Sequence, residues 1–92
     1  MNAAPKILYI EDHPDNRMLV RSVLGPAGYT VLEAPDGLSG IEVALREQPA
    51  VILLDINLPG VDGYEVVSII KSFPNIAATP VIAVTALSLI HI

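Results

Sequence analysis

The 92-residue chain contains no cysteine and no tryptophan. Without cysteine it can form neither a disulfide framework nor a thiolate metal site. Long apolar runs are also missing, and none approaches the ~20 residues that a membrane-spanning helix needs. The N-terminus lacks the basic start and the longer apolar stretch of a signal peptide. We therefore expect a cytoplasmic protein with no membrane partner.

Basic residues are scarce as well. Five lysines and arginines stand against ten acidic residues, which gives a formal net charge of −5. The five are scattered along the chain, at Lys6, Arg17, Arg21, Arg46 and Lys71. Because nucleic-acid binding requires clustered positive charge to neutralise phosphates, we expect no direct contact with nucleic acid.

Apolar residues, by contrast, make up 52 % of the chain, enough for the core of one small domain. Short β-rich runs alternate with stretches of helical spacing. We expect strands at Lys6–Ile10, Tyr29–Glu33, Val51–Leu54 and Val81–Val84, and helices at Pro14–Leu24, from Leu38 to before Pro49, and at Tyr64–Ser72. This alternation predicts an α/β fold, a doubly wound parallel sheet with helices on both faces. The entirely apolar Val51–Leu54 is expected to be buried on both faces.

Polar residues follow three of the four expected strands. Glu11 and Asp12 follow the first, Asp55 and Asn57 the third, and Thr85 the fourth. Ligands of parallel α/β sheets bind at the carboxyl ends of the strands, so these side chains converge if the three strands are neighbours. Clustered carboxylates repel one another unless a cation is bound, and oxygen ligands favour Mg²⁺.

Such a cluster can hold a phosphoryl group against a nucleophilic carboxylate, and a threonine hydroxyl can donate to a phosphate oxygen. Each residue alone has a simpler explanation. An aspartate after a strand is usually a turn or cap residue, and Glu11-Asp12 before Pro14 suits the N-terminus of a helix. The joint pattern at three strand ends favours the chemical interpretation.

Three motifs give the chain a resemblance to a known family. The segments "ILYIEDHPDNRMLV", "LLDINLPGVDGYEVV" and "TPVIAVTAL" occur in this order, and the chain resembles, over residues 6 to 86, the receiver domain of two-component response regulators and hybrid histidine kinases. The resemblance implies a flavodoxin-like sheet of order 2-1-3-4-5. It also implies a phosphorelay role, in which Asp55 accepts a phosphoryl group from a histidine on a histidine kinase or histidine phosphotransfer protein.

The resemblance assigns further residues to the site. Glu11, Asp12, Asp55 and the backbone carbonyl of Asn57 are expected to hold Mg²⁺. Thr85 corresponds to the switch residue that contacts the phosphoryl group, with the small Ala86 beside it, and Pro59 and Gly60 shape the loop after Asp55. Asn16, Arg17 and Arg21 lie on the helix that docks the histidine-bearing partner in this family, although a solvated helix face explains each of them equally well.

The chain also departs from the family pattern. Receiver domains continue past the fourth strand with a helix, a fifth strand that ends in a lysine, and a last helix, and no such lysine follows Thr85 here. We therefore expect residues 1–86 to form a partial receiver domain that lacks the last strand and the last two helices, and residues 87–92 to be a non-native tail. The fourth strand should then expose its edge and favour self-association.

Two other functions remain open. Without the lysine, Mg²⁺ binding is expected to be weak and phosphorylation impaired, so the chain could be a phosphorylation-independent interaction domain. The third candidate is a Mg²⁺-dependent phosphohydrolase with an aspartyl nucleophile. Such enzymes generally carry a second acid two residues beyond the nucleophile, where this chain has Asn57, so the phosphohydrolase is the weakest of the three.

Overall fold

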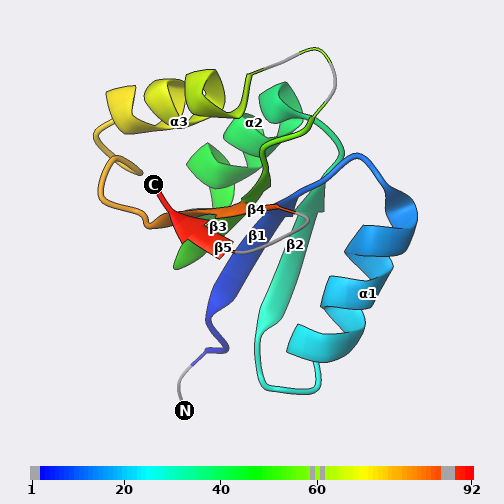
Figure 1. The fold of residues 1–92 in the computed structure, drawn as a ribbon. Helices are drawn as coiled ribbons and strands as arrows, with labels where there is room; N and C mark the ends of the chain where they lie inside the picture. The colour runs from blue at the N-terminus through cyan, green and yellow to red at the C-terminus, as the bar shows by residue number, and fades with distance from the viewer. Residues whose placement is uncertain (1–2, 59, 61, 86–88) are drawn as a thin grey trace.

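The computed structural model describes residues 3–58, 60, 62–85 and 89–92 (Figure 1). Its elements are, in order, β1 (Lys6–Ile10), α1 (Pro14–Leu24), β2 (Thr30–Ala34), α2 (Gly37–Glu47), β3 (Val51–Asp55), α3 (Gly63–Ser72), β4 (Val81–Val84) and β5 (Leu89–His91). The four strands and three helices predicted from the sequence are confirmed, with ends that differ by one residue at most places. None of the helices in the described ranges is long and apolar enough to cross a bilayer.

The sheet has the order β2-β1-β3-β4-β5, and its first four strands are parallel. The predicted doubly wound arrangement is therefore confirmed. Helices α2 and α3 cover one face, while α1 lies on the other (Figure 1). Because β1, β3 and β4 are neighbours, the polar residues that follow them are brought to one edge of the sheet.

The core lies between the sheet and the α2–α3 layer. Its fully buried side chains come from alternate positions of the strands and from the inner faces of the two helices, and include Leu8, Ile10, Ile52, Leu54, Val66, Ile70 and Val81. Gly40 lets α2 approach β1 closely, since a Cβ at this position would lie only 2.4 Å from Cδ1 of Ile10. This close contact fixes the height of α2 above the strand that leads into the site.

The opposite face of the sheet is only partly covered, which corrects one prediction. Ile52 and Leu54 of β3 are buried, but Leu53 between them is only half-buried, so β3 is not buried on both faces as its composition suggested. The reason is that, within the described part of the chain, α1 is the one helix that lies on this side (Figure 1). An apolar groove of about 330 Å³ remains there, lined by Tyr9, Leu19, Val20, Val23, Leu24, Leu53 and Val84.

Helix α1 contributes the outer wall of this groove. Its apolar residues keep the predicted helical spacing, yet Leu19 is 63 % exposed and Val23 61 % exposed, and α1 contains no buried residue. The helix is therefore attached to the sheet mainly along one side, next to β2.

The predicted exposed edge of β4 is wrong. Strand β5 pairs with it in antiparallel orientation, with Val84 opposite Leu89 and Ile82 opposite His91. Only residues 85–88 separate the two strands, which is too short for the crossover that a parallel pair requires but sufficient for a reversal of direction. The backbone groups on this side of β4 are therefore paired within the chain. The predicted self-association through an exposed β4 edge is not supported. Leu87 and Ser88 of the expected non-native tail lie outside the described residues.

Candidate functional site

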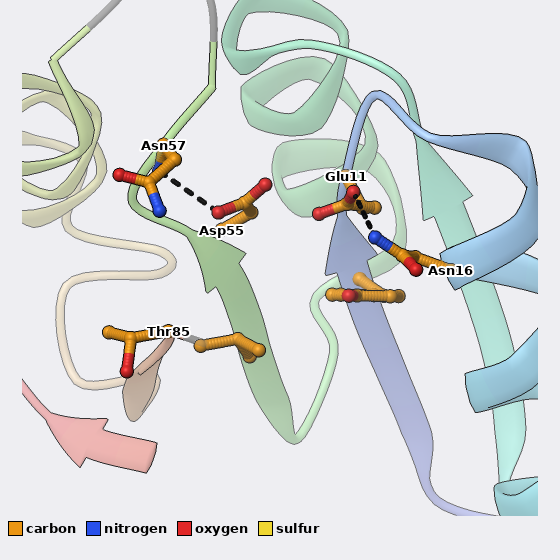
Figure 2. Close-up of a pocket in the computed structure, with 7 residues that line it drawn as sticks. Glu11, Asn16, Asp55, Asn57 and Thr85 are labelled. Carbon is orange, nitrogen blue, oxygen red and sulfur yellow. Dashed lines mark hydrogen bonds between the residues drawn. The ribbon is translucent and has the colours of Figure 1, made fainter. Parts of the chain in front are cut away.

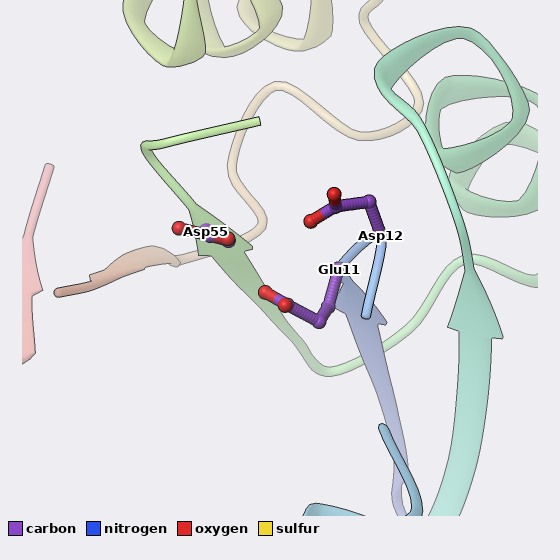
Figure 3. Close-up of side chains that lie close together, drawn as sticks. All are labelled: Glu11, Asp12 and Asp55. Carbon is purple, nitrogen blue, oxygen red and sulfur yellow. The ribbon is translucent and has the colours of Figure 1, made fainter. Parts of the chain in front are cut away.

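Three carboxylates meet at the carboxyl edge of the sheet. Glu11 and Asp12 directly follow β1, and Asp55 is the last residue of β3. The parallel register pairs Ile10 with Leu54, which places Glu11 beside Asp55. One carboxylate oxygen from each of the three acids lies within 4.8 Å of the others (Figure 3). We call these residues the acidic triad.

Glu11 and Asp55 of the triad border a pocket of about 220 Å³, whose lining residues are Tyr9, Glu11, Asn16, Asp55, Asn57, Val84 and Thr85 (Figure 2). Four residues that the sequence placed at the site therefore line one cavity: Glu11, Asp55, Asn57 and Thr85. The fourth strand contributes through its last residue and the half-buried Thr85 after it. Thr85 thus faces the same cavity as the acids of the first and third strands.

The side chain of Asp55 is held by the loop that follows it. Its Oδ1 accepts a hydrogen bond from the backbone N–H of Asn57 over 2.9 Å. Aspartate commonly bonds the backbone two residues on, and this local turn restricts the side chain to one orientation. The turn directs the carboxylate into the pocket, where the sequence prediction placed it.

Glu11 is the most buried member of the triad, with 2 % of its surface exposed. Its Oε1 accepts from Nδ2 of Asn16 over 2.9 Å and from the backbone N–H of His13 over 3.3 Å. Burial raises the pKa of Glu11, the neighbouring Asp55 carboxyl adds to the rise, and the bonds from Asn16 and His13 oppose it. A buried anion beside a second carboxylate is unfavourable unless a cation compensates for it.

The donor set suits a hard divalent cation. Carboxylate oxygens are the ligands that Mg²⁺ prefers, and it is usually bound through one or two carboxylates with water and phosphate oxygens completing the shell. Glu11, Asp12 and Asp55 supply such oxygens within 4.8 Å of one another. The residues present therefore fit the metal that the sequence predicted.

Helix α1 contributes more to the site than the sequence indicated. Asn16 and Arg17, predicted only as partner-docking residues, bond to the residues of the triad, and Arg21 pairs with Glu33 at the end of β2. Docking itself stays a prediction for all three. The sequence signal was the position of Asn16 and Arg17 in the first turn of a helix that starts directly after the acidic pair.

Tyr9 was missed by the sequence analysis. It is buried and lines both the pocket and the apolar groove. Burial, followed by the charges of Glu11 and Asp55, raises the pKa of Tyr9 to about 12. The alternation of β1 places Tyr9 two residues before Glu11 and on the same side of the strand, and this spacing could have identified it.

The remaining predicted residues have varied outcomes. Gly60 adopts a positive φ of 81° in the loop after β3, a conformation that glycine adopts without strain and that agrees with its predicted role in shaping the loop. Pro59 and Ala86 lie outside the described residues.

Both lysines of the chain are bonded away from the acidic triad: Lys6 pairs with Glu47, and Lys71 donates to the carbonyls of Ala77 and Thr79.

Comparison with known proteins decides the family. A family model described as the response regulator receiver domain matches residues 7–90. The chain belongs to the response regulator receiver domain family. The receiver domain spans almost the whole sequence, and the acidic triad is the part of it that fits the active site of this family.

Relatives and solved structures agree with this assignment. The receiver domain is 42 % identical over 87 residues to the DNA-binding dual master transcriptional regulator RpaA of Synechocystis sp., which covers 95 % of this chain and 36 % of that protein. It is 35 % identical to the polar-differentiation response regulator DivK of Brucella anthropi, covering 90 % of this chain and 68 % of DivK.

A solved structure resembles the fold closely. The receiver domain of the sensor histidine kinase PA1611 from Pseudomonas aeruginosa, which has a magnesium ion coordinated in its active-site cleft, matches with a TM-score of 0.85 and 36 % identity, over 91 % of this chain and 69 % of that one. The present chain spans only about a third of the length of RpaA. Receiver domains thus occur in both regulators and sensor kinases among these matches, and act as signalling modules.

Proposed function

We propose that this receiver domain accepts a phosphoryl group on Asp55, with Mg²⁺ bound by Glu11, Asp12, Asp55 and the carbonyl of Asn57. The observation that carries the proposal is the meeting of three carboxylates from β1 and β3 within 4.8 Å. The donor would be a phosphorylated histidine of a histidine kinase or of a histidine phosphotransfer protein, and α1, with Asn16, Arg17 and Arg21, would form part of the docking surface.

The proposed transfer requires little covalent chemistry from the protein. An oxygen of the Asp55 carboxylate forms a bond to phosphorus while the bond between phosphorus and the partner's imidazole nitrogen breaks, and that nitrogen keeps the electron pair. The Asn57 N–H holds the Asp55 side chain in place during the approach. The Thr85 hydroxyl would donate to a phosphoryl oxygen. Mg²⁺, when bound, supplies charge stabilisation for the transferring group.

Among its described lining residues, the pocket lacks a lysine that could stabilise the transferring phosphoryl group. Neither lysine lines the pocket, and each is bonded at another place in the fold. A well-placed donor at a transferring group typically contributes about 3–4 kcal/mol to transition-state stabilisation. We therefore expect phosphorylation to be slow and Mg²⁺ binding to be weak.

Incubation with acetyl phosphate and Mg²⁺, followed by intact-mass measurement, tests the proposal. We expect a slowly accumulating species that carries one added phosphoryl group, absent in Asp55→Asn and absent when EDTA replaces Mg²⁺. Asp62→Asn serves as the matched control, since Asp62 caps α3 outside the triad. Modification that persists in Asp55→Asn would contradict the assignment of the acceptor.

The engagement of both lysines elsewhere favours a second candidate, an interaction domain that works without phosphorylation. The two functions differ in their dependence on Asp55. If a partner binds the Asp55→Ala variant as tightly as the unaltered chain, and Mg²⁺ does not change that affinity, the second function is favoured. The site does not support the phosphohydrolase alternative, because residue 57 is asparagine and not the second acid that such enzymes carry.

A further inference from the structure

The loop between β1 and α1 carries two of the three triad residues, and an arginine of α1 holds its backbone. We propose that Arg17 is a positioning residue that presets the Glu11–Asp12 half of the site for Mg²⁺. This inference rests on the proposed function, because it concerns the metal that the triad is proposed to bind. It assigns Arg17 a role inside the site, separate from any contact with a partner.

Arg17 bonds to the backbone carbonyls of the acidic pair Glu11 and Asp12. Its Nη1 donates to the carbonyl oxygen of Glu11 over 2.7 Å and to that of Asp12 over 3.1 Å. Its Nε lies 3.4 Å from Oε1 of Glu33 at the end of β2. The side chain is 20 % exposed, so these bonds are partly shielded from water. One guanidinium thus connects the two acidic residues to a neighbouring strand.

These bonds act on the orientation of the carboxylates. Each carbonyl belongs to the peptide plane that leaves Glu11 or Asp12, so holding both carbonyls restricts the backbone dihedrals of the pair. A planar guanidinium suits this task because its donors stand in a fixed geometry, which a lysine ammonium lacks. Asn16, the preceding residue, holds the Glu11 carboxylate itself. The first turn of α1 therefore supports both the backbone and a side chain of the site.

The positive charge of Arg17, taken alone, predicts that this residue weakens Mg²⁺ binding. Arg17 is a cation close to a proposed cation site, and among the described residues its ion pair is with Glu33, not with the triad. If Arg17 acted only through its charge, removing it would strengthen Mg²⁺ binding by relieving repulsion. If it acts by positioning, removing it weakens binding. The sign of the change therefore distinguishes the two roles.

Arg21 provides a matched control. It lies one turn further along α1 and also pairs with Glu33, but it makes no bond to the Glu11 or Asp12 carbonyl among the described contacts. Replacing it removes the same charge from the same helix and leaves the loop backbone held. An effect on Mg²⁺ affinity confined to Arg17 would thus come from the loop contacts.

The experiment is isothermal titration of Mg²⁺ into the whole chain and into Arg17→Ala, Arg17→Lys and Arg21→Ala. Loss of an outer partner of a metal ligand typically costs about 10–100-fold in affinity, and we expect Arg17→Ala to raise the Kd for Mg²⁺ by about tenfold. Arg17→Lys should recover part of this loss, and Arg21→Ala should bind as tightly as the unaltered chain or slightly more tightly. Thermal unfolding in EDTA measures the stability of each variant separately, and Kd is compared only among folded samples.

Unchanged or tighter Mg²⁺ binding by folded Arg17→Ala would overturn the inference while leaving the proposed function intact. If Arg17→Ala does not fold, Arg17→Lys decides: weaker binding than the unaltered chain supports positioning, and equal binding overturns it. Absence of Mg²⁺ binding by the unaltered chain would overturn the proposed function together with this inference.

Discussion

The side-chain amide of Asn16 donates to the carboxylate of Glu11 over 2.9 Å, from the first turn of α1 to the end of β1. This bond engages the least exposed carboxylate of the triad and favours its charged form, in opposition to the effect of burial. A residue predicted only to meet a partner thus helps to keep a proposed metal ligand ionised and oriented.

Replacing Asn16 with alanine should therefore weaken Mg²⁺ binding, by about tenfold on the usual scale for such partners. The Glu11 carboxylate would lose both its orientation and a bond that stabilises its charge. Titration calorimetry measures the effect, with Asn75→Ala as the control, because Asn75 is exposed in the loop before β4. Equal affinities in the two variants would show that Asn16 does not support the site.

Glu11→Gln should stabilise the metal-free protein and weaken Mg²⁺ binding. The raised pKa of Glu11 means that the folded chain holds this proton more tightly than the unfolded chain. Its contribution to stability is thus present below the ordinary glutamate pKa of 4.5 and is lost as the pH rises through the folded value. Glutamine carries no charge and removes this loss.

Thermal unfolding in EDTA at about pH 7 and about pH 4 tests this prediction. We expect the variant to melt higher than the unaltered chain at neutral pH and the difference to shrink in acid. Addition of Mg²⁺ should reverse the order at neutral pH, because only the unaltered chain retains the full donor set. A variant that melts lower at neutral pH without metal would contradict the account of burial.

Asp36 should stabilise α2 in a pH-dependent manner. Its carboxylate caps the helix by accepting from the backbone N–H of Ser39 over 2.8 Å, and this bond lowers the pKa of Asp36. The stabilisation is thus present above the ordinary aspartate pKa and is lost as the pH falls through the lowered folded value. Asp36→Ala should cost about 1 kcal/mol of unfolding free energy at neutral pH.

The matched variant for the cap is Asp36→Asn, because asparagine caps helices without a titrating charge. Urea unfolding of the three proteins at about pH 7 and about pH 3 distinguishes the effects. Asparagine should retain most of the stability at neutral pH and lose less of it in acid. If the unaltered chain and Asp36→Asn lose the same unfolding free energy in acid, the acid sensitivity comes from another residue.

Gly40→Ala should destabilise the fold although alanine favours helices. A Cβ at Gly40 would lie 2.4 Å from Cδ1 of Ile10, and such overpacking typically costs about 1–3 kcal/mol. The gain in helix propensity is about 1 kcal/mol. Cγ1 of Ile10 would also lie 2.7 Å from that Cβ, and Ile10→Ala removes both atoms. The double variant with Ile10→Ala should therefore be more stable than the two single changes predict by addition. Strict additivity in urea unfolding would contradict the close contact.

The sequence was sufficient for the four parallel strands, the three helices and the triad, but not for β5. Buried apolar runs and helical spacing located every strand of the parallel sheet, and the acids at their ends identified the site, because the end of a strand is a local property of the chain. Asp55 was the clearest case, since a polar residue after the apolar Val51–Leu54 run can hardly be placed anywhere except at the edge of the sheet.

Contacts between distant segments could not be predicted from the sequence. The bonds of Arg17 to two backbone carbonyls depend on the angle at which α1 leaves the loop, and no residue pattern encodes that angle. The half-exposed side of β3 was missed for a related reason: composition shows that Leu53 is apolar, whereas its burial depends on which helices cover the sheet. The pairing of β5 was missed because three residues are too few for a periodic signal.

The wall shared by the acidic pocket and the apolar groove has a spectroscopic consequence. Tyr9 and Val84 line both cavities, and the chain has no tryptophan. Of its three tyrosines, Tyr29 and Tyr64 are exposed to solvent and Tyr9 is buried. The near-ultraviolet circular dichroism of this protein should therefore come mainly from one ring, and that ring lines the acidic pocket on one side and the apolar groove on the other. A single intrinsic signal can thus record events in both cavities without any label.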